Sequence, residues 1–405
     1  MSFATPVYAM GSRPLSEPGD AQVKVAVAQG QENVALMVRG GYTLQALGTG
    51  EAVADSAQGM DVLSLTPHDS GLLLNGERLG LFGLRLCPLK EGNLWVDGKR
   101  LRGNLCVLRE KDRTLTVINE VGVENYLAGV MRGELPKGWP AAAYEAQAIA
   151  SRTFALYRTV ERFDRDYALT SDVSSQVYEG KSAETWASNK AVRKTAGKVL
   201  TWEGRIFPAF YHSDSGGHTQ SAHHLWKVDI APLAGVPSPY GEGSPYAHWE
   251  FSVKAAGLGW AFRQKGYAFQ GGVEDWEILD RDVSGRIQRI RFIGSGEPLT
   301  LSGAQLREVL GVSRLRSTQV ELRKEGELIF FAGSGWGHGV GMSQWGAYDM
   351  ANQGYSAEEI LAHYYPGAQI RDWREVFEAG AWGIKEEQLE AWKGQQWVRP
   401  QSKTN

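Results

Sequence analysis

Residues 119–157 read NEVGVENYLAGVMRGELPKGWPAAAYEAQAIASRTFALY, and this stretch decides the fold of the central part of the chain. The spacing of one apolar helical face is repeated by Val123, Tyr126, Leu127 and Val130. Pro136 disfavours helical backbone at the residue before it, so we expect the first helix to end near residues 133–134. Pro140 is tolerated at a helix start and precedes an alanine-rich segment, which predicts a second, closely packed helix.

Glu134 lies between these two expected helices, next to the proline-containing turn. The negative end of a helix dipole favours the protonated form of a carboxyl group. A general acid needs a fixed mount and a proton to give. The sequence therefore predicts Glu134 as a catalytic acid and base, and a solvated carboxylate at a helix end is the alternative.

Three long segments follow one another along the chain. They are residues 126–157 of the stretch above, FPAFYHSDSGGHTQSAHHLW at 207–226, and GSGWGHGVGMSQWGAYDMANQGYSAEEILAHYYPGAQI at 333–370. Together they resemble the signature of the SpoIID/LytB family. The resemblance implies a lytic transglycosylase that cleaves peptidoglycan glycan strands to 1,6-anhydro ends, in sporulation engulfment or wall remodelling. It also implies the alternative of a non-catalytic enhancer of an N-acetylmuramoyl-L-alanine amidase.

In that family the glutamate of the matching G-E-x-P motif is the acid, and Glu134 occupies its position. Ordinary glycosidases use two carboxyl groups, whereas a lytic transglycosylase needs one, because the C6 hydroxyl of muramic acid attacks C1 and no water is activated. No cofactor is required for this chemistry. The other acids near the motifs, which we consider as alternatives, are Glu120, Glu124, Asp172 and Asp214.

A second set of residues is predicted to bind the glycan. Arg152 lies on the second helix among small residues and needs an anionic partner, which is either a protein carboxylate or a substrate carboxylate. The glycine-rich motifs allow close backbone approach to a sugar, or form tight turns that only pack. A Ser-His hydrolase triad is disfavoured, since the Gly-x-Ser-x-Gly elbow is absent from the sequence. Besides Arg152, the predicted substrate-binding residues are Gln176, Tyr178, His212, Ser213, Ser215, His338, Ser343 and Gln344.

Metal binding is a separate question. Some members of the family hold zinc with one His and two Cys, partly from the segment that matches residues 207–226. Here His212, His218 and His224 recur at intervals of six residues and are chemically able to bind Zn²⁺. Cys87 and Cys106 lack the spacing of a zinc site and are either two buried thiols or a disulfide between neighbouring strands.

The composition and the hydrophobic pattern exclude some classes of protein. With 405 residues and a net charge of −3, the chain is globular and has no basic run typical of nucleic-acid binding. No apolar run is long enough for a membrane span, and residues 1–20 lack the basic start of a signal peptide. The resemblance nevertheless implies work outside the cytoplasmic membrane, in the cell envelope or after secretion.

We therefore predict an α+β fold: a mixed β-structure that carries the helical pair at a groove, with inserted lobes. The hairpin signals Asn75-Gly76 and Asp97-Gly98 place a β-rich region before the helices, and Ser356 begins a helix through a capping box with Glu359. The predicted organisation is a flexible leader at 1–20, a β-rich region at 21–118, a core at 119–375 with an inserted lobe at about 240–330, and a polar tail at 376–405 that contains a helix at 385–394.

Overall fold

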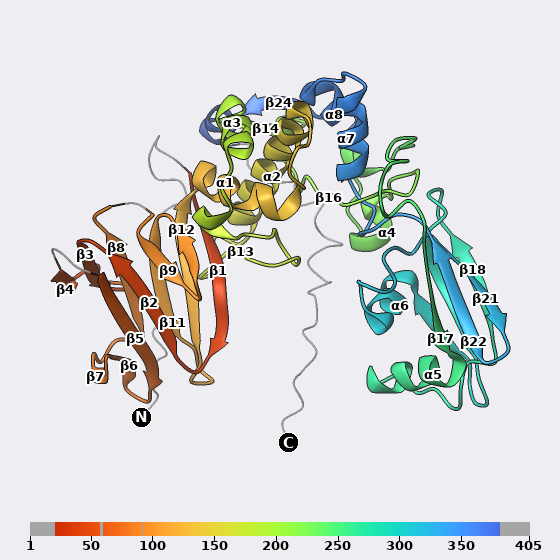
Figure 1. Ribbon diagram of the computed structural model, residues 1–405, viewed down its shortest axis with the longest axis horizontal. Helices are drawn as coiled ribbons and strands as arrows, with labels where there is room; N and C mark the ends of the chain where they lie inside the picture. Colours follow the sequence, from red (N-terminus) through yellow and green to blue (C-terminus); the bar gives the residue numbers. More distant parts are fainter. Residues whose placement is uncertain (1–20, 57–59, 91, 381–405) are drawn as a thin grey trace. The chain divides into compact units, whose positions relative to one another are not determined.

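The computed structural model describes residues 21–56, 60–90 and 92–380, and it has the predicted α+β fold (Figure 1). The expected leader, and residues 381–405 of the expected tail with its predicted helix, lie outside the described residues, whereas residues 376–378 belong to the helix Trp373–Glu378. The chain divides into two compact units. Of the described residues, unit 1 contains 21–56, 60–90, 92–199, 205–208 and 371–380, and unit 2 contains 200–204 and 209–370.

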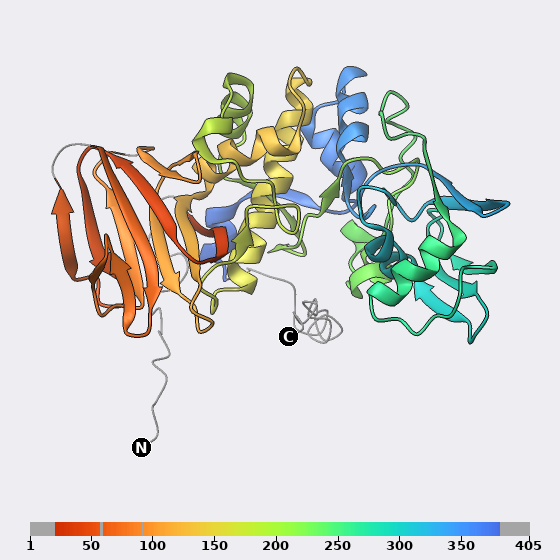
Figure 2. The same cartoon turned by 60° about the horizontal axis from the view of Figure 1, so that its bottom comes forward.

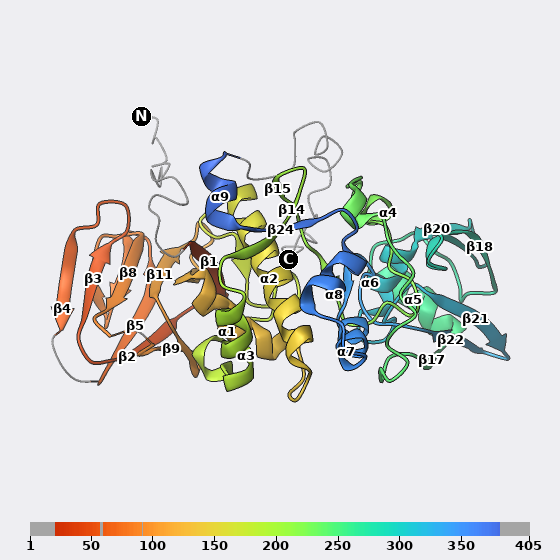
Figure 3. The same ribbon diagram turned by 90° about the horizontal axis from the view of Figure 1, so that it is seen from above.

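Unit 1 begins with two stacked sheets, which Figure 3 shows as two layers. The first has the order β13-β1-β12-β11-β8-β3-β4 and the second the order β10-β9-β2-β5-β6-β7. The strands of the first are β1 (Gln22–Gln31), β3 (Tyr42–Ala46), β4 (Ala52–Ser56), β8 (Gly83–Pro88), β11 (Asn104–Arg109), β12 (Leu115–Gly122) and β13 (Leu169–Thr170). Those of the second are β2 (Val34–Arg39), β5 (Met60–His68), β6 (Gly71–Leu74), β7 (Glu77–Arg78), β9 (Leu94–Val96) and β10 (Lys99–Leu101).

Turn chemistry fixes two of these hairpins. Asn75 and Asp97 adopt positive φ values of 50° and 48°, and each is followed by a glycine. Both residues lie between paired antiparallel strands, β6 with β7 and β9 with β10. The two predicted hairpins are therefore confirmed, because Asn and Asp tolerate the left-handed backbone that a two-residue turn requires.

The helical pair follows β12, whose residues are all buried. Helix α1 (Val123–Glu134) ends at the predicted position, and helix α2 (Ala141–Glu161) starts directly after Pro140. Both helices contact β1, and α1 also contacts β12 (Figure 2). The remaining helices of unit 1 are η1 (Gly180–Ala183), α3 (Trp186–Lys194) and α9 (Trp373–Glu378).

The two cysteines are free thiols. Cys106 faces Arg85 across the β8–β11 pair, whereas Cys87 faces Thr43 across the β3–β8 pair, so the register places neither opposite the other. Burial raises the pKa of the Cys106 thiol to about 12. Of the two alternatives considered for the cysteines, the structure shows free thiols.

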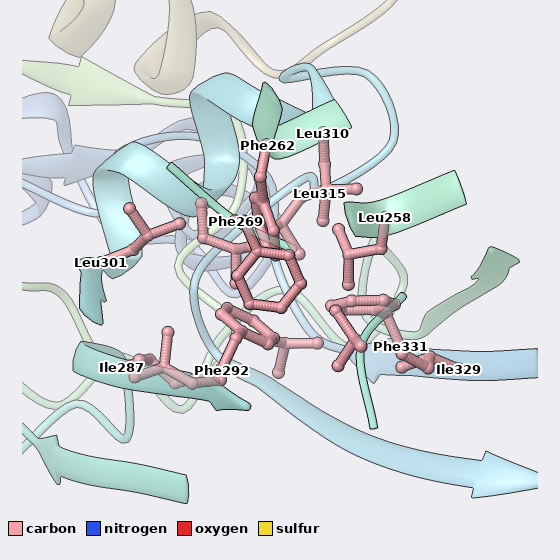
Figure 4. Close-up of a cluster of buried hydrophobic side chains, with 14 of the residues drawn as sticks. Leu258, Phe262, Phe269, Ile287, Phe292, Leu301, Leu310, Leu315, Ile329 and Phe331 are labelled. Carbon is pink, nitrogen blue, oxygen red and sulfur yellow. The ribbon is translucent and has the colours of Figure 1, made fainter. Parts of the chain in front are cut away.

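Unit 2 contains a lobe with its own apolar core, shown in Figure 4. Phe262, Phe292 and Phe331 meet there and are fully buried. Two three-stranded sheets and two helices enclose this core. They are β17 (Trp249–Lys254), β22 (Leu328–Gly333) and β21 (Val320–Glu325); β18 (Asp275–Arg281), β19 (Ile287–Ile293) and β20 (Leu299–Ser302); and α5 (Ala255–Gln264) and α6 (Gly303–Leu310).

The rest of unit 2 carries the glycine-rich motifs. Strands β16 (Tyr211–His212) and β23 (Met342–Ser343) pair in parallel. Ser356 and Glu359 form the predicted capping box at the start of α8 (Ala357–Tyr364). The other helices are α4 (Ala222–Trp226), η2 (Ala231–Leu233) and α7 (Gln344–Asn352), and the chain passes between the units in β14 (Lys198–Trp202), β15 (Arg205–Ile206) and β24 (Gln369–Asp372).

Candidate active site

Glu134 is the last residue of α1 and is half-buried. Its Oε1 accepts a hydrogen bond of 2.9 Å from the main-chain N–H of Val177. Leu135 leaves the helix with extended backbone, and its N–H bonds back to the carbonyl of Met131. The carboxyl group is therefore held at a fixed helix end by a main-chain donor, as a proton-transfer group requires.

Two glycines bring the segment 171–180 against α1. A Cβ atom added at Gly133 would lie 2.6 Å from the carbonyl oxygen of Val177, and one at Gly129 would lie 2.7 Å from Cε2 of Tyr178. The main-chain N–H of Glu179 also donates to the carbonyl of Gly129 at 3.2 Å. Any larger residue at these two positions would push the Val177 donor away from the helix end.

Gln176 and Tyr178, predicted to face the substrate, are each only 1% exposed. The hydroxyl of Tyr126 donates to Oε1 of Gln176 at 3.0 Å, and the Tyr178 hydroxyl donates to Oδ1 of Asn119 at 2.8 Å. Burial and the nearby charge of Glu134 raise the pKa of Tyr126 well above its ordinary value, so this hydroxyl keeps its proton. Both predicted residues lie next to the candidate acid, but they contact protein groups.

Arg152 has a completely buried side chain. It donates to both carboxylate oxygens of Glu124, at 2.8 and 2.6 Å, and to the main-chain carbonyl of Lys198 at 3.0 Å. Of the two partners that the sequence left open, the structure supplies the protein carboxylate. Glu120 is similarly paired with Arg85 at 2.9 Å. Glu120 and Glu124, the two alternative acids, are therefore both held in ion pairs, which makes them poorer candidates for a proton donor than Glu134.

The second and third motifs come together within unit 2. The hydroxyl of Ser343 accepts the main-chain N–H groups of Ser215 and Gly346, both at 3.2 Å. The carbonyl of Ser213 accepts the N–H of Trp345 at 3.0 Å. Ser215 and Ser343 are fully buried and Ser213 is half-buried. Gln344, which begins α7, is 7% exposed.

The imidazoles of His212 and His338 belong to the same cluster, with ring centroids 5.5 Å apart. Trp226 lies 5.1 Å from His338 and 4.2 Å from Phe210, measured between ring centroids. Nδ1 of His212 lies 3.1 Å from the carbonyl oxygen of Val340, which can only accept, so this nitrogen carries the proton. The N–H of Val340 donates to Nδ1 of His338 at 3.0 Å, so that nitrogen carries the lone pair.

Both imidazoles are neutral at pH 7. Burial, assisted by the positive charges of Arg307 and Arg286, lowers the pKa of His338 to about 3. Burial also lowers the pKa of His212 well below its ordinary value, with the neighbouring His338 as a smaller cause. Nε2 of His212 is buried, and no described residue forms a hydrogen bond with it.

The three histidines considered for zinc are not assembled into a metal site. Within residues 21–56, 60–90 and 92–380, no group of three or more His, Cys, Asp or Glu side chains is arranged to hold a metal ion. Nδ1 of His218 lies 2.7 Å from the carbonyl oxygen of Thr219, and His224 is exposed on α4. The residues present therefore do not fit a zinc ion in this structure.

Sequence reasoning missed one residue of this cluster that the structure makes prominent. Arg286 is fully buried and donates to the carbonyls of Ser215 and His218 at 2.7 and 2.8 Å. It lies in the turn between β18 and β19, far from the glycine motifs in the sequence. An isolated arginine beside a turn gives no signal by which the contact could have been predicted.

Comparison with known proteins supports the interpretation of the motifs. The family model of the stage II sporulation protein SpoIID matches residues 111–202, and a domain of unknown function, DUF8618, matches residues 246–341. The stage II sporulation protein D of Bacillus amyloliquefaciens is 34% identical over 273 residues, which cover 63% of this chain and 76% of that protein. An uncharacterized protein of Brachyspira hyodysenteriae is 28% identical over 350 residues, 80% of this chain and 89% of its own length.

A third relative carries a different name. The amidase enhancer of Bacillus subtilis is 26% identical over 293 residues, which are 60% of this chain and 40% of that longer protein. The fold, the helix-end carboxyl group and these relatives define a class of proteins related to sporulation and the cell wall. The chain belongs to the SpoIID family. Among its described residues, no helix combines the length and apolar character that crossing a membrane requires.

Proposed function

We propose that this protein is a lytic transglycosylase, which cleaves peptidoglycan glycan strands between N-acetylmuramic acid and N-acetylglucosamine. The observation that carries the proposal is the carboxyl group of Glu134, half-buried at the end of α1 and bonded at 2.9 Å to the Val177 N–H. Its place in the family motif and its fixed geometry support the role of acid and base. We place the activity in the cell envelope, outside the cytoplasmic membrane.

The reaction needs only one carboxyl group. Glu134 gives its proton to the glycosidic oxygen as the bond from C1 of the muramic acid breaks. The C6 hydroxyl of the same sugar then forms a bond to C1, and its proton passes to Glu134, which restores the acid. No water is consumed, so the second carboxylate that a hydrolase uses to activate water is not needed.

Unit 2, considered by itself, has side chains to which we assign a separate contribution to glycan binding. Ser213, Trp336 and Trp345 are half-buried at the glycine-rich turns, so part of each side chain remains accessible. A hydroxyl group suits hydrogen bonding to sugar hydroxyl and N-acetyl groups, and indole rings offer apolar faces for stacking. The buried members of the cluster, Ser215 and Ser343, would instead hold the turns in place.

The test is a product analysis. Purified full-length protein is incubated with glycan strands from which the stem peptides have been removed, and the fragments are examined by mass spectrometry. The proposal expects 1,6-anhydro-muramic acid ends. Reducing ends formed with uptake of water would indicate a hydrolase, and intact strands would remove the proposed enzymatic activity.

The second candidate function rests on the relative named amidase enhancer. In that case the chain binds peptidoglycan and stimulates an N-acetylmuramoyl-L-alanine amidase without cleaving glycan itself. An assay of such an amidase on intact peptidoglycan distinguishes the two functions. If the chain is an enhancer, the wild type and Glu134→Gln raise the amidase rate by the same factor. Neither protein then cleaves glycan strands that lack stem peptides.

A further inference from the structure

The hydrogen bond to Glu134 comes from a segment without regular structure. Val177 lies between η1 and β13, in a stretch where no strand or helix fixes the backbone. The direction of a main-chain N–H in such a segment depends on what anchors the residues beside it. The neighbours of Val177 on both sides are Gln176 and Tyr178, whose side chains are each 1% exposed.

Gln176 ties one side of Val177 to the helical pair. Its Oε1 accepts the hydroxyl of Tyr126 on α1 at 3.0 Å, and its Nε2 donates to the carbonyl of Ser151 on α2 at 3.3 Å. The side-chain amide therefore contacts both helices, and α1 is the one that ends in Glu134. Buried polar groups that are satisfied on both ends hold a single arrangement, because any alternative leaves a donor or acceptor unpaired.

Tyr178 ties the other side to the sheet. Its hydroxyl donates to Oδ1 of Asn119 at 2.8 Å, and the amide of Asn119 in turn donates to the carbonyls of Arg102 and Asn104, at 2.8 and 2.9 Å. The rings of Tyr126 and Tyr178 also lie 5.0 Å apart between centroids, tilted by 38°. Gln176 and Tyr178 are thus both hydrogen-bonded to the sheet or the helices of unit 1.

We infer that Gln176 and Tyr178 are positioning residues, which act through the main-chain N–H of Val177 to hold the carboxyl group of Glu134 in its reactive orientation. The inference rests on the proposed function. It assigns these two residues to the support of the acid, in place of the direct sugar contact that the sequence suggested. Because neither side chain reaches solvent, their loss should affect the chemical step more than substrate binding.

The first measurement needs no activity. Amide hydrogen exchange of Val177 is followed by NMR in the wild type, Tyr126→Phe, Tyr178→Phe and Gln176→Leu. We expect Val177 to exchange at least about tenfold faster in each variant, since its hydrogen bond to Glu134 is weakened. Tyr364→Phe is the matched control, because it also removes a buried hydroxyl bond, 2.8 Å to Ser238 in unit 2. It should leave Val177 unchanged.

The second measurement uses release of anhydro ends. The three variants should lower kcat by about tenfold or more with KM within about twofold of the wild type. Unchanged Val177 exchange, or an equal fall in kcat in the Tyr364→Phe control, would overturn the inference. If Val177 exchange rises as expected while the wild type releases no anhydro ends, the proposed function fails and the support of Glu134 by the two anchors stands.

Discussion

Arg152 and Glu124 form a two-pronged ion pair in which the guanidinium group is completely buried, with contacts of 2.8 and 2.6 Å. The pair joins α2 to α1, and Oε1 of Glu124 also accepts the N–H of Gly197 at 3.2 Å. Since α1 ends in Glu134, this ion pair helps to fix the helix that presents the candidate acid. Arg152 thus contributes to function by holding α1 in position.

Removing Arg152 should therefore destabilise the fold. Arg152→Met leaves Glu124 without its counter-charge in a largely buried place, and we expect the free energy of unfolding to fall by about 3–5 kcal/mol. Urea denaturation measures the loss. Arg113→Met is the control, because the Arg113–Asp69 pair is 68% and 69% exposed and should add nothing measurable. Equal midpoints for the two variants would show that the buried pair is not structural.

Replacing Glu134 should remove activity and spare stability. Glu134→Gln keeps an oxygen that can accept the Val177 N–H but has no proton to give, so we expect release of anhydro ends to fall by about 10²–10⁴-fold. The urea midpoint should stay at the wild-type value. Glu145→Gln on α2 changes a carboxylate that pairs with Lys194 at 2.9 Å and should retain full activity. Glycan cleavage by Glu134→Gln at the wild-type rate would exclude Glu134 from the mechanism.

The ends of the helical pair could be predicted because they follow from local chemistry. Pro136 and Pro140 restrict the backbone at their own positions, and the observed ends of α1 and start of α2 agree with them. Asn75 and Asp97 acted in the same local way in the hairpins. The position of Glu134 at a helix end was predictable for this reason, whereas its partner Val177 lies 43 residues away in sequence.

The roles of the other polar residues could not be predicted so well. Gln176 and Tyr178 were expected to contact sugar, and the structure gives each a buried protein partner. A sequence pattern cannot distinguish a polar side chain that faces a ligand from one that satisfies a buried group, because the distinction depends on tertiary contacts. Equal sequence intervals also do not by themselves make side chains converge. His212 lies on β16 and His224 on α4, and among the described residues no group of three or more His, Cys, Asp or Glu side chains is arranged to hold a metal ion.

Acid should destabilise the cluster that contains His338. Its pKa is lowered to about 3 by burial, whereas an unfolded histidine titrates near 6.5, so the unfolded chain binds the extra proton between these values. The stabilising effect is complete above pH 6.5 and is lost as the pH falls toward 3. The slope for one such group is at most about 1.4 kcal/mol per pH unit.

Urea midpoints followed by tryptophan fluorescence between pH 7 and pH 4 test this expectation. His338→Asn keeps an oxygen that can accept the Val340 N–H and should flatten the fall in stability. His223→Asn, at an exposed position on α4, serves as the histidine control and should follow the wild-type curve. The same slope in all three proteins would contradict a lowered pKa at His338.

Arg286 provides the last prediction, because it connects the lobe to the turn of the second motif. Its guanidinium donates to the carbonyls of Ser215 and His218, and a Cβ atom added at Gly339 would lie 2.6 Å from its Cζ. Burial lowers the pKa of Arg286 to about 10, so the group remains charged at pH 7. Arg286→Met leaves two carbonyls without this donor, and each buried unpaired carbonyl costs about 1–3 kcal/mol.

We therefore expect Arg286→Met to lower the urea midpoint and to speed amide exchange at Gly216, whose N–H bonds to Oδ1 of Asp214 within the turn. Arg291→Met is the matched control on β19, since Arg291 is 43% exposed and pairs with the exposed Glu277. Gly339→Ala should act in the same direction as Arg286→Met, because the added methyl group would displace the guanidinium and because φ is +85° at this position. If Arg286→Met and Arg291→Met give the same amide exchange rate at Gly216, the turn does not need the hydrogen bonds from Arg286. The contact would then not stabilise the turn.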